Sequence, residues 1–213
     1  MFAVTTPFEA GPQAEVAQGR AMLEAAETAR GPHLVLASMA SADRHTGIPH
    51  FESKARVEEL LASTGRPATV VAPAYFYDNA LGGAVIARGA PELALPAETP
   101  LQQVARRDLG ALVAAVPADP GRWIGHRVEV AGDAPTPRRM AAAISAAGTP
   151  VEYAPVPLAR VRAANADMGA MFTFLTETGY SVDIPALRAD FPDIGWTTFA
   201  DWAGKQTWSV RER

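Results

Sequence analysis

The feature that most constrains this fold is a series of short apolar runs that alternate with stretches of helical periodicity. Three such runs, at residues 2–6, 33–38 and 68–73, carry little polar alternation, which is typical of strands covered on both faces of a sheet. Parallel strands need a long crossover between them, and a helical stretch separates each run from the next. The pattern therefore predicts right-handed βαβ units and a parallel sheet.

Residue spacing and end signals predict the remaining elements. Two amphipathic helices are expected between the runs, at residues 13–29 and from His50 onward. Their inward-facing residues are expected to be Val16, Met22, Leu23, Ala26, Val57, Leu60 and Leu61. Thr136, Pro137 and Gly148 predict the cap, the first turn and the end of a later helix. Further helices are expected at residues 77–89 and 106–116, and further strands at residues 93–96, 127–132 and 151–156.

Composition excludes several classes of site and partner. The chain has 213 residues and no cysteine, which excludes disulfides, thiolate nucleophiles and cysteine-ligated metals. A net charge of -4 without a long Lys/Arg run gives no reason to expect nucleic acid as a partner. No apolar run approaches the roughly 20 residues that cross a bilayer, and the first residues do not resemble a signal peptide. We therefore expect a cytoplasmic protein with neither membrane nor nucleic acid as a partner.

Two common kinds of site are disfavoured by residue spacing. The four histidines, His33, His45, His50 and His126, show no metal-ligand spacing, so no metal site is expected. A hydrolase triad of Ser41, Asp43 and His45 would lie within one loop, and the G-x-S-x-G motif is absent.

A glycine-rich phosphate-binding turn is missing from the sequence. Doubly wound dinucleotide folds hold pyrophosphate on a turn of the G-x-G-x-x-G or G-x-x-G-x-x-G type, and neither pattern occurs here. The chain opens directly on an apolar strand, and an unpaired apolar edge invites association. A homodimer formed through this first strand is therefore one expected arrangement.

The stretch "GIPHFESKARVEELL", residues 47–61, places two titratable side chains at the start of a helix. His50 and Lys54 are four residues apart and so lie on one helix face. They form either a solvated surface pair or part of a ligand site. Ser38 and Ser41 lie at the carboxyl end of a predicted strand, where a doubly wound sheet has its ligand crevice.

With these pieces in order, the sequence resembles the NmrA-like branch of the atypical short-chain dehydrogenases/reductases. The resemblance spans residues 1 to about 202 and is carried by "FAVTTPFEAGPQAEVAQGRAMLEAA", "HLVLASMAS", "IPHFESKARVEELLASTGRPATVVAPAYFYDN", and "RRDLGALVAAV" followed by "GHRVEVAG". It implies a truncated Rossmann-like parallel sheet with flanking helices, without the first three strands and their glycine-rich turn, and a small C-terminal α+β region that covers a substrate. Residues 1–90 would form the partial NAD(P)-binding core, and residues 91–213 the other strands and the lid, as one compact unit.

The resemblance also implies roles for individual residues. His50 and Lys54 occupy the positions of the family's Tyr-x-x-x-Lys pair, in which the lysine binds the nicotinamide ribose and the tyrosine delivers a proton. Here His50 replaces the tyrosine. Ser38 falls near the catalytic serine. The residues implied to face the cofactor, NADP(H), are Thr5, Thr6, Pro7, Phe8, Ser38, Lys54, Pro73, Tyr75, Phe76 and Asn79.

Three functions remain open from the sequence. The first is an NAD(P)(H)-binding redox sensor or regulator, because the usual catalytic tyrosine is absent. The second is an NADPH-dependent reductase of a quinone or a similar small carbonyl compound, with a pocket formed by Phe8, Tyr75, Phe76 and Met171. The third is a truncated remnant that binds no dinucleotide.

Overall fold

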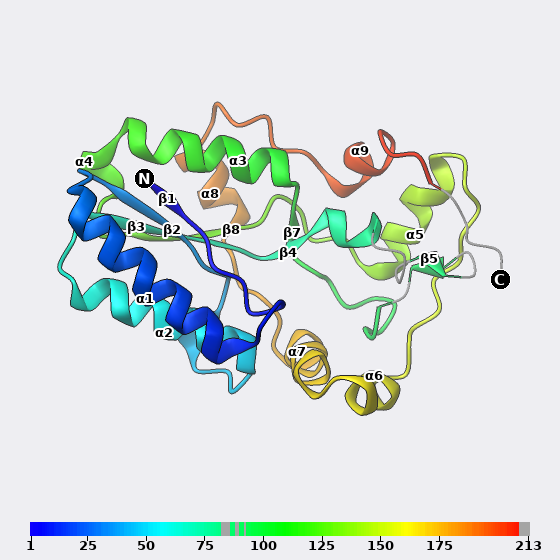
Figure 1. Cartoon of the computed structure of the whole chain (residues 1–213). Helices are drawn as coiled ribbons and strands as arrows, with labels where there is room; N and C mark the ends of the chain where they lie inside the picture. The colour runs from blue at the N-terminus through cyan, green and yellow to red at the C-terminus, as the bar shows by residue number, and fades with distance from the viewer. Residues whose placement is uncertain (82–85, 88–89, 92, 209–213) are drawn as a thin grey trace. The chain divides into compact units, whose positions relative to one another are not determined.

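The computed structural model of the chain describes residues 1–81, 86–87, 90–91 and 93–208 (Figure 1). The chain forms two compact units that alternate along the sequence. The first comprises residues 1–73 and 110–130, and the second comprises residues 74–109 and 131–213. The expected division into a core of residues 1–90 and a lid of residues 91–213 stays a prediction.

The first unit is built on a four-stranded parallel sheet. Its strands are β1 (Phe2–Ala3), β2 (Leu34–Ala37), β3 (Ala68–Pro73) and β8 (Arg127–Val130), in the order β1-β2-β3-β8. The predicted α/β fold with a parallel sheet is confirmed. β1 is shorter than the five residues expected, and the backbone carbonyl of Thr5 accepts a hydrogen bond from Lys54 instead of a strand partner.

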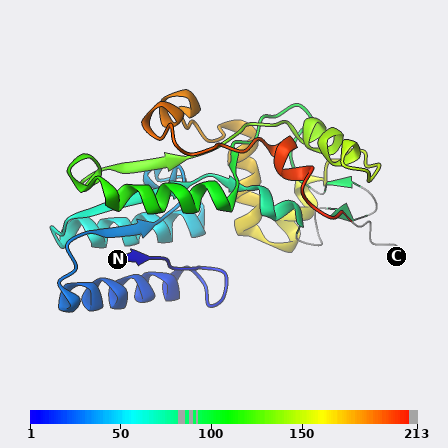
Figure 2. The same ribbon diagram turned by 90° about the horizontal axis from the view of Figure 1, so that it is seen from above.

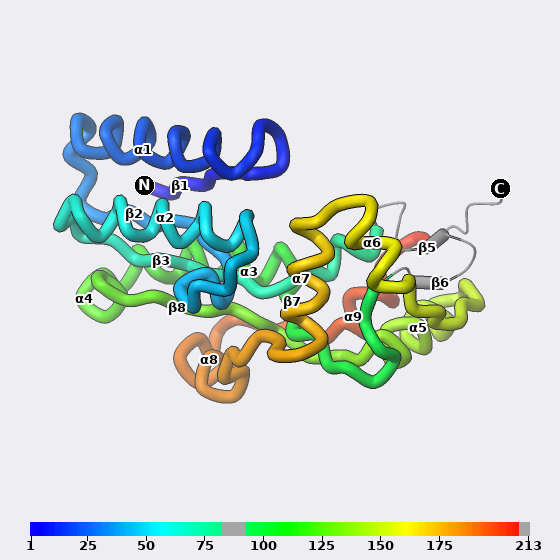
Figure 3. Tube along the Cα trace, turned by 90° about the horizontal axis from the view of Figure 1, so that it is seen from below, coloured from blue at the N-terminus to red at the C-terminus, as the bar shows by residue number. Residues whose placement is uncertain are grey.

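Helices cover both faces of this sheet. α1 (Pro12–Ala29) and α2 (Pro49–Ser63) lie side by side on one face, as the view from below shows (Figure 3). On the opposite face lies α3 (Arg106–Ala115), which is in front in the view from above (Figure 2); its residues 110–115 belong to this unit and residues 106–109 to the second. The unit also contains η1 (Ala42–Arg44), η3 (Val116–Ala118) and the single turn α4 (Pro120–Trp123). Strands with helices on both faces account for the apolar runs without polar alternation.

The core between α1, α2 and the sheet is small and tightly packed. Its buried residues are Ala3, Leu23, Leu34, Leu36, Val57 and Leu61. Gly19 faces Val57 across the two helices, and a Cβ built on Gly19 would lie only 2.6 Å from Cγ2 of Val57. A glycine is therefore needed at this position for the helices to approach this closely. Of the residues expected to face inward, Val16, Met22 and Leu60 are only half-buried.

The second unit has little strand and several short helices. β4 (Tyr75–Phe76) pairs in parallel with β7 (Gln103–Val104), and β5 (Ile86–Ala87) pairs antiparallel with β6 (Ala90–Pro91). Its helices are η2 (Tyr77–Leu81), α5 (Pro137–Ala146), α6 (Leu158–Ala164), α7 (Ala166–Glu177), α8 (Ile184–Asp190) and α9 (Phe199–Ala203). α5 begins as its sequence predicts, because the side chain of Thr136 accepts a hydrogen bond from the N–H of Arg139.

Three elements predicted for this unit differ from the structure, and one of them lies partly outside the described residues. The expected helix at residues 77–89 is a 3₁₀ helix that ends at Leu81, followed by β5, and residues 82–85 and 88–89 lie outside the described residues. The strands expected at residues 93–96 and 151–156 are irregular. These two segments are joined by the N–H of Val156 and the hydroxyl of Tyr153, both of which donate to the Leu93 carbonyl. A side-chain hydroxyl thus takes part in holding together segments that have no strand ladder.

Within the described ranges, the helices are all too short or too polar to cross a bilayer.

Candidate functional site

The start of α2 is fixed by its own sequence. Ile48 is extended and Pro49 occupies the first turn, where a missing N–H costs nothing. The N–H of Gly47 donates to the carboxylate of Glu52 at 2.8 Å, and the N–H of Ile48 donates to the hydroxyl of Thr46 at 3.3 Å. These contacts set where the helix begins, and therefore which way His50 and Lys54 point.

His50 is buried, with an exposed fraction of 2%. Its ring packs against two aromatic rings, with centroid distances of 5.6 Å to Phe8 and 4.9 Å to Phe51. Phe8 itself is 71% exposed, so it covers the histidine from the solvent side. The interpretation of His50 and Lys54 as a solvated surface pair is therefore wrong, because the fold covers both side chains.

Lys54 is held at the carboxyl end of β1. Its ammonium donates to the backbone carbonyl of Thr5 at 2.7 Å and to the Thr5 hydroxyl at 3.2 Å. It also lies 2.8 Å from Oε1 of Glu15, and its side chain is only 10% exposed. A lysine ammonium has three donor protons, and here three protein oxygens surround it.

Glu15 is the residue that the sequence reasoning missed. It lies in the first turn of α1, and none of its surface is exposed. Besides Lys54, its carboxylate accepts hydrogen bonds from the Thr5 hydroxyl at 2.7 Å and the Ser53 hydroxyl at 2.5 Å. A signal was present in the sequence. Glu15 precedes Gly19 and Leu23 at intervals of four residues, and so lies on the buried face of an amphipathic helix, where a carboxylate needs a partner.

Glu15, Thr5, Ser53 and Lys54 form a buried polar network that joins the end of β1 to the first turns of α1 and α2. Burial of an ammonium or a carboxylate alone is costly, and mutual pairing with additional hydrogen bonds offsets that cost. The result is an ammonium of fixed position whose charge is cancelled. Such a group can orient a ligand oxygen by hydrogen bonding.

Ser38 follows β2, and its hydroxyl donates to Glu58. Glu58 also receives a hydrogen bond from Nε of Arg127 at 3.0 Å. Burial by itself would lower the pKa of Arg127, but Glu58, Glu129 and Asp43 outweigh that effect and raise it. Ser38 thus belongs to a second polar network, on the Arg127 side of α2.

The loop after β1 contains three further predicted residues. The hydroxyl of Thr6 accepts a hydrogen bond from the N–H of Phe8 at 3.4 Å, and the carbonyl of Pro7 accepts one from Gly11 at 2.9 Å. These contacts bend the loop toward the start of α1. The structure therefore brings Thr5, Pro7, Phe8, His50 and Lys54 into one region of the first unit.

The other predicted residues follow β3. Pro73 is the last residue of that strand, is buried, and accepts a hydrogen bond from the N–H of Ala40. Tyr75, Phe76 and Asn79 belong to the second unit. There, the half-buried side chain of Tyr75 is hydrogen-bonded to Asn79, and burial raises the tyrosine's pKa despite that bond. Their predicted role beside a nicotinamide stays a prediction.

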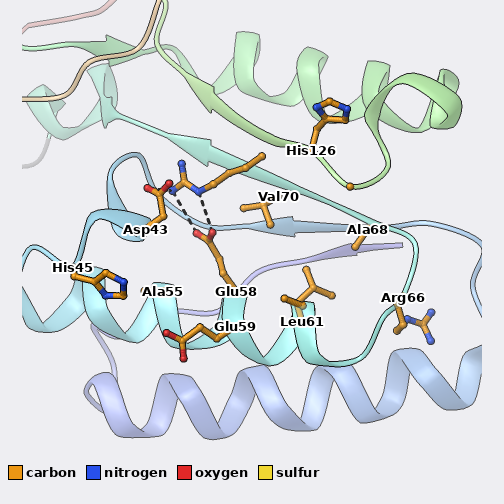
Figure 4. A pocket seen from close by; sticks show the side chains of 13 residues that line it. Asp43, His45, Ala55, Glu58, Glu59, Leu61, Arg66, Ala68, Val70 and His126 are labelled. Atoms are coloured by element: carbon orange, nitrogen blue, oxygen red, sulfur yellow. Dashed lines mark hydrogen bonds and ion pairs between the residues drawn. The ribbon is translucent and has the colours of Figure 1, made fainter.

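A pocket of about 440 Å³ lies elsewhere in the first unit, beside α2 (Figure 4). It is lined by Asp43, His45, Ala55, Glu58, Glu59, Leu61, Ala62, Arg66, Ala68, Val70, Gly125, His126 and Arg127. Figure 4 shows Asp43 and His45 at one end and Arg66 at the other, with Val70 and Ala68 between them. Its main charged groups already have protein partners, since Glu58 pairs with Arg127 and Glu59 with Arg56. None of the predicted site residues lines this pocket.

The three residues of the loop triad each contact other residues. Asp43 lies 3.4 Å from the Arg127 guanidinium, whereas His45 is exposed and lies 4.0 Å from Glu52. The N–H of Ser41 donates to Glu129. Across the described parts of the chain, no three His, Cys, Asp or Glu side chains are grouped so that they could hold a metal ion.

A comparison with protein families gives a match to the NmrA-like family over residues 1–203. The chain belongs to the NmrA-like family. This agrees with the resemblance carried by the residues around His50 and Lys54, and the match covers nearly the whole sequence.

Solved structures with a similar fold were also found. An NADPH-dependent quinone oxidoreductase from Escherichia coli, in complex with NADPH, matches with a TM-score of 0.77 and 21% identity over 95% of this chain and 74% of that one. NmrA, a negative transcriptional regulator solved with NADP, matches with a TM-score of 0.69 and 21% identity over 96% and 72%. The Citrobacter sp. triphenylmethane reductase with NADP(H) gives 0.74 and 19% identity over 96% and 74%. At these identities the likeness establishes the fold.

Proposed function

We propose that this protein binds NAD(P)(H) and acts as a redox sensor or regulator, without the tyrosine-based proton delivery of short-chain dehydrogenases. The observation that carries the proposal is the position of Lys54. Its ammonium is held at the carboxyl end of β1 in a parallel sheet, which is where such sheets bind ligands. The family supports a nicotinamide dinucleotide, since relatives were solved with NADP and with NADPH.

The regulator role is supported by the environment of His50, which lies one helical turn before Lys54. His50 takes the place of the tyrosine, is buried, and is packed between Phe8 and Phe51. A ring so enclosed is poorly placed to exchange protons with solvent during repeated turnover. Binding without turnover suits a protein that reports the redox state of the dinucleotide to another protein.

The first test is a titration of the 213-residue chain with NADPH, followed by nicotinamide fluorescence or calorimetry. We expect saturable micromolar binding that is weakened by Lys54→Met. The chain has one other lysine, the exposed Lys205, so Lys205→Met is the matched control. No binding at millimolar NADPH would contradict the proposal and favour a folded relative that has lost dinucleotide binding.

A second candidate function is reduction of a quinone or a similar small carbonyl compound by NADPH. The exposed ring of Phe8, which lies against His50, offers a flat apolar surface beside the predicted nicotinamide position. The discriminating measurement is the oxidation of NADPH in the presence of a benzoquinone. Turnover that is lost in His50→Phe and reduced in Phe8→Ala would favour a reductase, whereas binding without turnover favours the sensor.

We also propose a homodimer through the first strand. Phe2 and Val4 are 50% and 60% exposed, and β1 pairs on one side only among the described strands. Exposed apolar strand edges favour pairing with another chain. Sedimentation of the wild type and of Val4→Lys tests this, because a lysine at the edge should shift a dimer to the monomer.

A further inference from the structure

The buried carboxylate of Glu15 has no assigned role in a dinucleotide site, yet it contacts the residue on which the proposed function rests. Its Oε1 atom lies 2.8 Å from the Lys54 ammonium, and its Oε2 atom accepts from the Ser53 hydroxyl at 2.5 Å. Because Glu15 and Ser53 are buried and come from different helices, the carboxylate has little freedom to move.

The three contacts of the Lys54 ammonium are not equivalent. The carbonyl of Thr5 at 2.7 Å and the carboxylate of Glu15 at 2.8 Å are close, whereas the Thr5 hydroxyl is at 3.2 Å. That hydroxyl also donates its own proton to Glu15 at 2.7 Å. It can therefore keep its hydrogen bond to the carboxylate when another oxygen takes its place at the ammonium. The Lys54 N–H that is directed at Thr5 Oγ1 is therefore the one that can donate a hydrogen bond to a ligand oxygen.

The charge balance restricts what that ligand oxygen can be. Glu15 and Lys54 together carry no net charge, and the atoms around them are neutral oxygens of Thr5 and Ser53. A phosphate placed here would face a buried carboxylate within the same network and would lose its hydration without gaining an unpaired cation. A hydroxyl carries no charge for the carboxylate to repel, and its loss of hydration costs much less than that of a phosphate.

We propose that Glu15 is the positioning residue for Lys54, and that by cancelling the lysine's charge it makes this point reject a phosphate. This inference rests on the proposed function for the identity of the ligand. The positioning by Glu15 and the rejection of phosphate can be tested without it.

The positioning is tested by nuclear magnetic resonance of the chain labelled with ¹⁵N-lysine. The chain contains two lysines, so the spectrum has an internal reference. The wild type should give a slowly exchanging ammonium signal from Lys54 and none from the exposed Lys205. We expect Glu15→Gln to lose that signal while the backbone spectrum stays folded, and Ser53→Ala, which leaves the Glu15–Lys54 contact in place, to retain it. A folded Glu15→Gln variant that keeps the signal would overturn the proposal.

The selectivity is tested with inorganic phosphate as the probe, against chloride at matched ionic strength. Glu15→Gln frees the lysine's charge, so phosphate should raise its melting temperature by several degrees and leave the wild type and Glu15→Gln/Lys54→Met unchanged. Equal responses of all three proteins would overturn the selectivity. If Glu15→Gln does not fold, the double variant Glu15→Gln/Lys54→Met tests the reason. We expect the double variant to fold, because it no longer buries an unpaired lysine charge. Its failure to fold would contradict the proposal.

Binding of NADPH separates this inference from the proposed function. We expect Glu15→Gln to weaken NADPH binding about tenfold and to make it more sensitive to salt. Wild-type affinity and wild-type salt dependence in the folded variant would overturn the role of Glu15. A wild type that binds no NADPH would instead contradict the proposed function, and the ammonium signal and the phosphate response would still decide the role of Glu15.

Discussion

Each of the two units buries a carboxylate in the first turn of a helix, and the two carboxylates bind different kinds of donor. Glu15 in the first unit is fully buried, and Asp108 in the second is 2% exposed. Glu15 binds an ammonium and two hydroxyls. Asp108 binds the backbone N–H of Thr197 at 2.7 Å and its hydroxyl at 3.1 Å.

The difference shows what each carboxylate does. Asp108 fastens the segment that leads into α9, together with Tyr77, whose hydroxyl donates to the Thr197 carbonyl. A backbone amide can serve as a structural partner at almost any position. Glu15 instead neutralises a side chain that could have been apolar if packing were its only purpose. A buried pair of opposite charges is weak evidence for stability, and the Glu15–Lys54 pair therefore fits the function that we propose for Lys54.

The largest expected effect on stability comes from breaking the Glu15–Lys54 pair of the first unit. Lys54→Met leaves Glu15 buried without its cation, which should lower the free energy of unfolding by about 3–5 kcal/mol. The double variant Glu15→Gln/Lys54→Met should recover most of this loss. Urea denaturation of the wild type, both single variants and the double variant measures the coupling. Additive losses would mean that the two side chains do not interact.

Removing the carboxylate of the second unit should cost less. Asp108→Ala removes the shared acceptor of two hydrogen bonds and leaves the N–H of Thr197 without that partner, which should lower the free energy of unfolding by about 1–3 kcal/mol. The measurement is hydrogen exchange at residues 197–203, which should become faster, with exchange in residues 34–37 as the control. Unchanged exchange around Thr197 would mean that Asp108 does not hold this segment.

Substitution of two glycines that lie at helix contacts, one in each unit, would show how firmly each contact is packed. Gly19→Ala would place its Cβ 2.6 Å from the buried Val57, and should cost about 1–3 kcal/mol through overpacking. Gly169→Ala would meet Arg162 Cγ at 2.5 Å, but α6 has no buried residues and can move away. We expect the smaller loss from Gly169→Ala in thermal denaturation. The reverse order would mean that α6 is as firmly held as α2.

The smallest effect is an alkaline loss of stability in the second unit. Burial raises the pKa of Tyr153 to about 12, and burial followed by the nearby Asp133 raises the pKa of Tyr77 still further. The unfolded pKa is about 10, so their contribution is complete below pH 10 and is lost as the pH rises toward 12. All four tyrosines lie in the second unit, so tyrosinate absorbance reports on that unit alone. Tyr153→Phe should flatten the pH dependence of the urea midpoint and cost about 1 kcal/mol below pH 10.

Local signals were enough to predict the sheet of the first unit. β3 spans the predicted residues 68–73. The observed ends of α1 and α3 and the observed start of α2 lie within one residue of the predicted positions. These elements have long periodic or uniformly apolar stretches, and Pro12 and Pro49 mark their starts. The strands expected at residues 93–96 and 151–156 had apolar residues, but the first is only four residues long and Glu152 interrupts the second. Their chain direction is set instead by single hydrogen bonds from Tyr153 and Val156.

The sequence by itself determined the family, the parallel sheet, and the pairing of His50 with Lys54 on one helix face, because all three depend on neighbours in the chain. Only the tertiary structure decided that both side chains are buried and that Glu15, 39 positions before Lys54, is the lysine's partner. A contact between the first turns of two helices depends on how those helices pack. That packing is fixed here by the close approach of Gly19 to Val57 and by the shared core beneath both helices.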